Sequence, residues 1–205
     1  MKTSAWIAAG GIALFATMAA LVFSGATVGV DRPIMEAAPA LHGTIGDALA
    51  IFVSKGLGFV ALTAATAAVA IWLFLRRRRL DAVIFAGTML TGLGTMVVLK
   101  QVFERARPTV FPWIDHADGF SFPSGHSFLN ATFWLLVALV VDRPWARVLA
   151  VVMTLLAGSF RVVAGVHWPS DVVAGWSLGI ALVACAALVR AWFTSRSGSA
   201  ITPAP

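Results

Sequence analysis

The sequence predicts an all-α integral membrane protein with six transmembrane helices. Of its 205 residues, 60% are hydrophobic and the mean hydropathy is +0.90, whereas soluble domains are about 45–50% apolar. Apolar runs of about 20 residues, the length that crosses a bilayer as a helix, recur along the chain. No linker or internal repeat divides them, so we expect one membrane domain over residues 1–193.

Six apolar stretches are the predicted membrane spans. They cover residues 5–26, 49–75, 82–99, 126–141, 147–166 and 171–193. The first follows Lys2 and ends in Ser24-Gly25-Ala26, which is typical of a signal peptide. Its apolar core is longer than the usual stretch of roughly 7–15 residues. We therefore favour an uncleaved helix, with cleavage as the alternative.

Flanking residues set the ends of the later spans. The second stops at the basic block Arg76–Arg79, after which the third begins. The fourth is the shortest and can borrow residues from the loop before it. Pro169 interrupts the fifth, because proline lacks a backbone N–H and clashes with the preceding turn. The sixth is followed by a small, polar, proline-containing tail at 194–205, which we expect to be disordered.

Lysine and arginine counts predict the orientation. With a cytoplasmic N-terminus, the inner helix ends and loops carry nine basic residues and the outer ones six. Four of the outer six belong to the polar clusters described next, so the positive-inside bias is stronger than the counts alone. The net charge of +6 does not indicate nucleic-acid binding, because the largest basic group, Arg76–Arg79, flanks an apolar run as topology signals do.

Three polar clusters interrupt the apolar pattern, at Lys100–Pro108, Pro123–His126 and Arg161–Asp171. Under the predicted topology all three lie at the outer ends of the third to sixth spans and meet on one face. Charged residues are costly in a bilayer and are usually functional there. Cations gather where an anion must be held. The convergence predicts phosphate chemistry at the membrane surface.

The last cluster combines a histidine with a carboxylate four residues later. Asp171 can hydrogen-bond one nitrogen of His167 and leave the other free to attack phosphorus. Alternatively, His167 is an interfacial residue, and Ser170 or Asp171 only caps the next helix.

The other two clusters supply an acid and anion contacts. Pro123–His126 opens a helix whose N-terminus attracts anions, Gly125 permits close backbone approach, and His126 is placed as a general acid. The alternative is an ordinary turn before a helix. Lys100 and Arg107 can bind phosphate as a point charge and a fork, or they can be snorkelling cations at a helix end. The joint occurrence of the three clusters favours the functional interpretation.

Together the clusters resemble a known family. The pattern Lys-x6-Arg-Pro, Pro-Ser-Gly-His and Arg-x5-His-x3-Asp over residues 100–171 is similar to the signature of the type 2 phosphatidic-acid phosphatase superfamily. That superfamily includes lipid phosphatases, undecaprenyl-diphosphate and phosphatidylglycerophosphate phosphatases, and vanadium haloperoxidases. The resemblance implies a metal-independent phosphatase that needs no cofactor and acts through a covalent phosphohistidine.

The resemblance also implies a role for each motif residue. His167 would be the nucleophile, Asp171 its orienting partner, and His126 the acid that protonates the leaving group and then the base that activates water. The implied phosphate-binding residues are Lys100, Arg107, Ser124, Gly125 and Arg161. The chain departs from the family pattern at Phe160, where serine is usual, and at Ala106, where proline is frequent; neither position carries an assigned role.

The expected substrate is a lipid phosphate or diphosphate presented by the phospholipid bilayer. Undecaprenyl diphosphate comes first, because the chain is small and short-looped, and phosphatidylglycerophosphate or phosphatidic acid follows. A lipid phosphotransferase using the same phosphohistidine is the alternative. A non-catalytic anion channel or transporter is more remote, because it predicts charges near mid-membrane or on both sides.

The compact loops and the Ala-, Val- and Arg-rich composition are typical of bacteria. We therefore expect a multi-pass protein of the bacterial inner membrane, with both termini in the cytoplasm and the active site facing the periplasm or exterior. We expect the remaining polar residues of the outer loops to be solvated. They are Glu36, His42, Asp115, His116 and Asp118. In the last span, Gly175 and Gly179 predict close helix packing.

Overall fold

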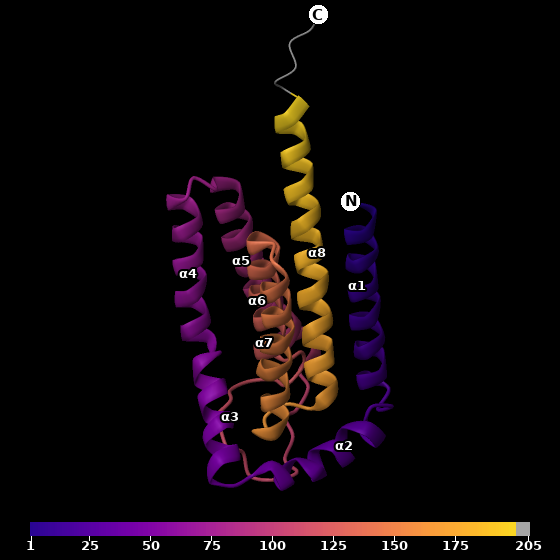
Figure 1. The fold of residues 1–205 in the computed structure, drawn as a ribbon. Helices are drawn as coiled ribbons and strands as arrows, with labels where there is room; N and C mark the ends of the chain where they lie inside the picture. Colours follow the sequence, from indigo (N-terminus) through magenta and orange to yellow (C-terminus); the bar gives the residue numbers. More distant parts are fainter. Residues whose placement is uncertain (200–205) are drawn as a thin grey trace, which may run out of the picture.

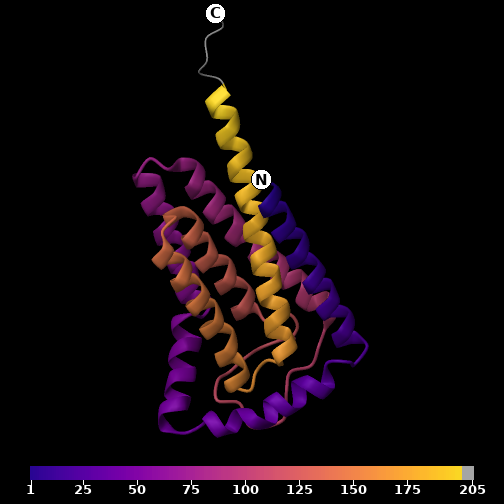
Figure 2. The same cartoon turned by 45° about the vertical axis from the view of Figure 1, so that its right-hand side comes forward.

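The computed structural model describes residues 1–199, without the side chains of Thr44 and of residues 197–199. This part of the chain forms a helical bundle (Figures 1 and 2). Its elements are α1 (Lys2–Phe23), α2 (Val28–Ala37), the 3-10 helix η1 (Ala38–Leu41), α3 (Thr44–Gly56), α4 (Phe59–Leu75), α5 (Arg79–Phe103), α6 (Gly125–Val141), α7 (Pro144–Val163) and α8 (Pro169–Ser199).

Four helices, α1, α5, α7 and α8, are long and apolar enough to cross a membrane. The helices α4 and α6 are apolar but have only 17 residues each. The bent pair formed by α2 with η1 and by α3 could make a fifth span. The structure therefore supports an all-helical membrane fold, while the count of six spans stays a prediction.

The predicted single span at 49–75 is wrong, because the chain breaks into α3 and α4 at Leu57-Gly58. A side chain at position 58 would lie 2.7 Å from the backbone oxygen of Ser54, so glycine suits this close turn. The break frees the backbone oxygen of Leu57, which accepts a hydrogen bond from Asn130 Nδ2 on α6 at 2.9 Å. A side chain from a distant helix thus stabilises a break that local sequence does not reveal.

The last helix also runs further than predicted. The tail was expected to be disordered from residue 194, yet α8 continues to Ser199. In this extension the Thr194 hydroxyl donates to the backbone oxygen of Arg190 at 3.1 Å, and Arg196 lies over the Trp192 ring at 3.9 Å. The rest of the predicted tail, residues 200–205, lies outside the described residues.

Helix α8 packs against α1 and α6, and α6 also packs against α7 (Figure 1). A side chain at Gly175 would lie 2.7 Å from the backbone oxygen of Ser124, and one at Gly179 would lie 3.0 Å from that of Phe128. The predicted close packing at these glycines is confirmed. Apolar side chains of α4, α5 and α6 form the main core, in which Phe85 is fully buried.

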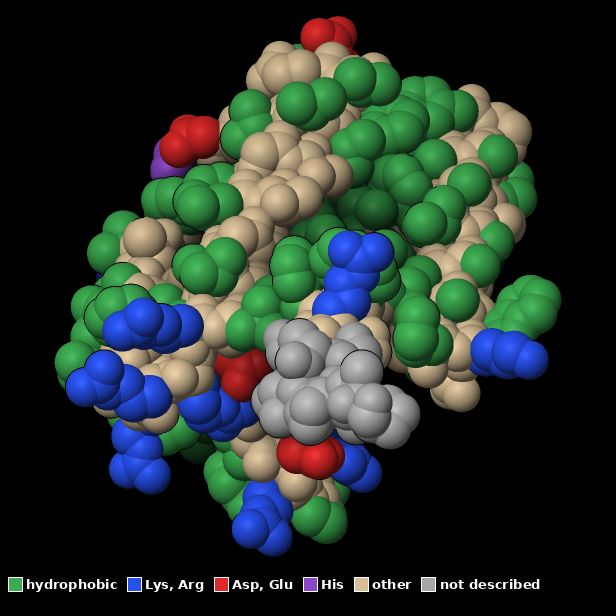
Figure 3. Space-filling model, turned by 90° about the horizontal axis from the view of Figure 1, so that it is seen from above, with side chains coloured by type: hydrophobic (Ala, Val, Ile, Leu, Met, Phe, Trp, Pro, Cys, Tyr) green, Lys and Arg blue, Asp and Glu red, His purple; other side chains and the backbone are tan. Residues whose placement is uncertain are grey.

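The two ends of the bundle differ. The N-terminus, the α4–α5 turn and the α6–α7 turn lie at one end, whereas α2 and η1 cross the other end (Figures 1 and 2). Seen from above, the first end carries many Lys and Arg side chains (Figure 3). Between 17% and 50% of the residues in the candidate spans are buried inside the protein. The remaining apolar surface matches a lipid environment.

Candidate active site

A polar cavity of about 340 Å³ lies where α5 and α7 end and α6 begins. Six of the eight predicted site residues line this cavity: Lys100, Arg107, Gly125, His126, Arg161 and His167. Asp171 lies behind His167, and Ser124 is buried beneath the cavity wall. Residues separated by more than 60 positions therefore share one site.

The imidazole of His167 is held with one nitrogen toward the cations. Its Nδ1 donates to Asp171 Oδ2 at 3.4 Å, and Arg107 Nη1 donates to its Nε2 at 3.3 Å. These partners fix the proton on Nδ1 and leave the lone pair of Nε2 facing a guanidinium. Burial lowers the pKa of His167 to about 3, so the ring is neutral at neutral pH.

The Asp171 carboxylate is fully buried and well satisfied. It accepts hydrogen bonds from the Ser121 hydroxyl, from the Arg105 guanidinium, and from the backbone N–H of Trp168 at 2.9 Å. The cap predicted for the following helix is different: the backbone N–H of Ser170 donates to Asp31 of α2, at 2.9 Å. The cap comes from a helix that the sequence does not predict, and Asp171 remains available to His167.

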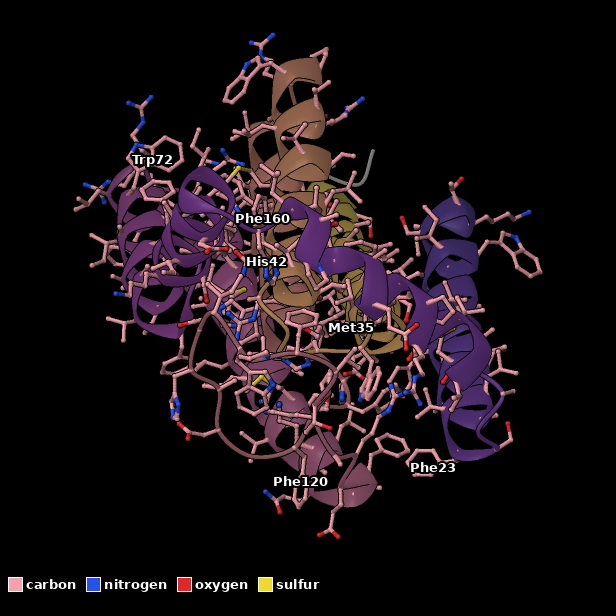
Figure 4. The ribbon with its side chains drawn as sticks, turned by 90° about the horizontal axis from the view of Figure 1, so that it is seen from below. Phe23, Met35, His42, Trp72, Phe120 and Phe160 are labelled. Carbon is pink, nitrogen blue, oxygen red and sulfur yellow. The ribbon has the colours of Figure 1, made fainter. Side chains whose placement is uncertain are left out.

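Two cations of the first cluster contact backbone oxygens of the following loop. Arg107 donates to Asp118 O at 2.7 Å and to Gly119 O at 2.9 Å, and Lys100 Nζ donates to Phe120 O, in the loop that Figure 4 labels. Burial lowers the pKa of Arg107 below its usual value, but a guanidinium stays charged. In this structure, the backbone oxygens of the loop thus accept the hydrogen bonds that Lys100 and Arg107 could donate to an anion.

Arg161 is 3% exposed and pairs with Asp115 at 2.8 Å. The Ser54 hydroxyl contacts both of these side chains. Burial raises the pKa of Asp115, but hydrogen bonds from Ser54 and Arg161 outweigh it and leave the pKa below its usual value. The Nε of Arg161 is buried with no hydrogen-bond partner among the described residues. An unsatisfied guanidinium donor is costly, and a phosphate oxygen would satisfy it.

Asp115 is therefore a residue that sequence reasoning missed. It was predicted to be solvated, but only 19% of its side chain is exposed. It lies in an irregular loop, where no periodicity signals burial. The neighbouring side chains of His116 and Asp118 are 82% and 90% exposed, which confirms the prediction for them.

The Pro123–His126 segment is built as a helix start. Ser124 is fully buried, and its Oγ accepts from the Ser127 backbone N–H at 3.4 Å and from the Ser127 hydroxyl at 2.9 Å, so it caps the helix and does not line the cavity. A Cβ at Gly125 would meet the Sδ atom of Met96 on α5, which lies in a flexible side chain that can move aside, so this contact does not by itself require glycine. His126 Nε2 donates to the backbone oxygen of Ser54 at 3.3 Å. His126 also lines the cavity.

Among the described residues, no three His, Cys, Asp or Glu side chains form a group that could hold a metal ion. The expected independence from metal stays a prediction, which a chelator tests directly.

Comparison with known proteins places the chain in a family. The model of the PAP2 superfamily matches residues 81–195, which is more than half of the chain and includes all three clusters. The chain belongs to the PAP2 superfamily. This match confirms the resemblance that the three motifs over residues 100–171 indicated.

Relatives in this superfamily are named as lipid phosphatases. Phosphatidylglycerophosphatase B of Bacillus subtilis (strain 168) is 40% identical over 94 residues, covering 42% of this chain and 46% of that protein. YbjG of Escherichia coli (strain K12), provisionally named an undecaprenyl-diphosphatase, is 31% identical over 149 residues, covering 70% of this chain and 72% of that protein. The chain spans less than half the length of several curated relatives that it matches.

Solved structures show the same fold. A transmembrane PAP2-type phosphatidylglycerolphosphate phosphatase from Bacillus subtilis superposes with a TM-score of 0.81 at 25% identity, over 88% of this chain and 96% of that one. LpxE of Aquifex aeolicus superposes with a TM-score of 0.68 at 18% identity, over 78% and 95%. With its long apolar helices, this PAP2 protein is an integral membrane protein.

Proposed function

We propose that the chain is a membrane lipid phosphatase acting through a phosphohistidine on His167. The observation that carries the proposal is the state of this ring: Nδ1 donates to Asp171, and Nε2 faces Arg107 at the cavity. A neutral imidazole with an oriented lone pair beside buried cations is suited to attack an electrophile that carries anionic oxygens.

The reaction would proceed in two displacements. His167 Nε2 attacks phosphorus, the bond between phosphorus and the leaving oxygen breaks, and His126 gives that oxygen a proton. His126 then takes a proton from water, whose oxygen attacks phosphorus, and the N–P bond breaks to release inorganic phosphate. Lys100, Arg107 and Arg161 neutralise the phosphoryl oxygens throughout.

A lipid substrate is supported by the surroundings of the cavity. An apolar groove of about 220 Å³ between α4 and α5 shares Phe59, Leu62 and Leu129 with the polar cavity. A headgroup held by the cations would leave its apolar chain along this groove, toward the bilayer. Undecaprenyl diphosphate is the first choice of substrate, favoured by the extended match to YbjG. Phosphatidylglycerophosphate or phosphatidic acid follows, favoured by the phosphatidylglycerophosphatase relatives.

The proposed topology has six spans, cytoplasmic termini and a site on the periplasmic or outer face of a bacterial inner membrane. Its support is the separation of charge: Arg76–Arg79 lies at the end of the bundle that holds the N-terminus, and the cavity lies at the other end.

The test is phosphate release by the detergent-purified protein in EDTA, from each of these three lipids, with the variant His167→Ala alongside. Release from at least one lipid, abolished in the variant, is expected. Phosphate release by His167→Ala at the wild-type rate would contradict the proposed phosphohistidine mechanism. Silence on every lipid, followed by activity when a second lipid is added as acceptor, would indicate a phosphotransferase.

A further inference from the structure

Helix α2 brings a buried carboxylate to the back of the site. Asp31 is 2% exposed, and it accepts hydrogen bonds from the backbone N–H of Ser170 at 2.9 Å and from its hydroxyl at 2.6 Å. Its third partner is Arg105, at 2.8 Å. Burying a carboxylate is costly unless it is paired and hydrogen-bonded. This one is fully paired, although it belongs to none of the three motifs.

The orientation of α2 directs Asp31 inward. Met35, one turn later, is fully buried, while Val30 and Ile34 are exposed. Seen from below, α2 crosses the end of the bundle close to α8, and Met35 is labelled on it (Figure 4). The helix therefore docks by one face, and Asp31 lies on that face.

Arg105 joins Asp31 to the partner of the nucleophile. Its Nη2 donates to Asp31, while its Nη1 donates to Asp171 and to the Ser170 hydroxyl. The guanidinium lies over the Trp168 ring at 5.4 Å. Unlike Arg107, Arg105 does not line the cavity, and 15% of its side chain is exposed. It is thus arranged to hold two carboxylates, not to bind substrate phosphate.

We propose that Asp31 is a positioning residue for the nucleophile, acting through Arg105 on Asp171. This inference rests on the proposed phosphohistidine mechanism. Asp31 and Arg105 compensate each other's charge, so the negative charge of Asp171 remains directed at His167. Without Asp31, Arg105 would pair with Asp171 alone and cancel that charge, and the backbone N–H of Ser170 at the start of α8 would lose its acceptor.

The consequence concerns the chemical step. The imidazole gains positive charge as Nε2 bonds to phosphorus, and an ionised, fixed Asp171 stabilises that charge. Substrate phosphate is bound by other cations, which do not contact Asp31. Loss of Asp31 should therefore lower kcat and leave KM nearly unchanged.

The experiment compares Asp31→Asn with Glu36→Gln. Both replace a carboxylate by an amide on α2, but Glu36 forms an exposed ion pair with Arg32. The readouts are kcat, KM and the single-turnover rate constant of phosphohistidine formation, which does not depend on the fraction of folded enzyme. We expect Asp31→Asn to lower kcat and that rate constant roughly tenfold, because hydrogen bonds to charged groups are the stronger class, and Glu36→Gln to match wild type.

A second comparison separates positioning from folding. In an Asp171→Asn background, Asp31→Asn should add little further loss, since its target is already removed. If Asp31→Asn does not fold, Arg105→Lys takes its place, because lysine keeps the charge but lacks the fork that joins both carboxylates.

Wild-type single-turnover rates in whichever of these two variants folds would overturn the inference. So would a loss in the Asp171→Asn background as large as in wild type. An inactive wild-type protein, or an active His167→Ala, would instead overturn the proposed function on which the inference rests.

Discussion

Two buried carboxylates at opposite ends of the same bundle, Asp171 and Asp81, have similar surroundings and different consequences. Asp81, at the start of α5, pairs with Arg78 at 2.8 Å and with Arg190 of α8 at 2.7 Å. Arg78 also donates to the backbone oxygen of Val140 at the end of α6. The contacts of Asp81 and its two arginines therefore join three helices, α5, α6 and α8. Asp171, in contrast, contacts the imidazole of His167, which lines the candidate active site.

The two ends differ in the side chains that line the neighbouring cavity and in whether a buried donor lacks a hydrogen-bond partner. A cavity of about 490 Å³ near Arg190 is larger than the one beside His167, but its lining includes no histidine. At the other end, His167 presents a lone pair to Arg107, and the buried Nε of Arg161 has no partner among the described residues. A buried ion pair alone therefore does not indicate a functional site, because ion pairs of this kind also serve structure. A buried hydrogen-bond donor without a partner, close to an oriented nucleophile, is stronger evidence for an active site.

The largest expected effect is a loss of phosphatase activity when His167, but not Asp81, is replaced. Replacing His167 by Ala should lower phosphate release by about a thousandfold or more, because the nucleophile is removed. Asp81→Asn should keep the wild-type kcat per folded molecule. Phosphate release in EDTA, normalised to folded protein, measures both. A comparable loss of kcat in Asp81→Asn would erase the distinction between the ends.

A charge-conserving pair of substitutions tests the cations in the same way. Arg161→Lys should lower kcat/KM roughly ten- to a hundredfold, since lysine lacks the forked donors that match phosphate. Arg190→Lys, at the other end, should leave kcat/KM within about twofold. Steady-state kinetics on one lipid suffices. Equal losses at both positions would contradict the assignment of Arg161 to phosphate.

The Asp81→Asn variant, which should keep its activity, should lose stability. Asp81→Asn leaves Arg78 and Arg190 without their carboxylate, which should cost about 2 kcal/mol once the one-third exposure of both arginines is allowed for. The Tm of the detergent-purified protein should fall accordingly. An unchanged Tm would mean that these arginines find other partners or enter solvent at little cost.

A smaller effect is expected from Asp115. Because its carboxylate pairs with Arg161, Asp115→Asn should free that guanidinium and make vanadate, a phosphate mimic, inhibit severalfold more strongly. Glu36→Gln is the control, because Glu36 forms an exposed ion pair with Arg32 and does not line the cavity. Weaker inhibition of Asp115→Asn would show that Asp115 chiefly orients Arg161.

The last comparison concerns the pH dependence of stability. The pKa of His167 is about 3 in the folded protein, against about 6.5 for an unfolded histidine. Between these values only the unfolded state binds the proton, so the stabilising contribution is complete above pH 6.5 and is lost as pH falls toward 3. Tm should therefore decrease less on acidification in His167→Gln than in wild type. The exposed His116→Gln should follow wild type, and identical acid slopes for all three proteins would contradict the buried neutral state.

The sequence by itself determined the apolar helical fold, the three clusters and the pairing of His167 with Asp171. It could do so because membrane spans require long apolar runs, and because a carboxylate four residues after His167 is close enough in the chain to reach back across the α7–α8 turn. The Gly175 and Gly179 packing was predictable because residues four apart in a helix lie on one face.

Tertiary structure alone decided the parts that depend on distant segments. The break between α3 and α4 relies on Asn130, the cap of α8 on Asp31, and the ion pair of Arg161 on Asp115. None of these partners has a fixed spacing from the residue that it serves. Local pattern reports which face of a helix is apolar, but which loop carboxylate reaches a buried cation is set by packing in three dimensions.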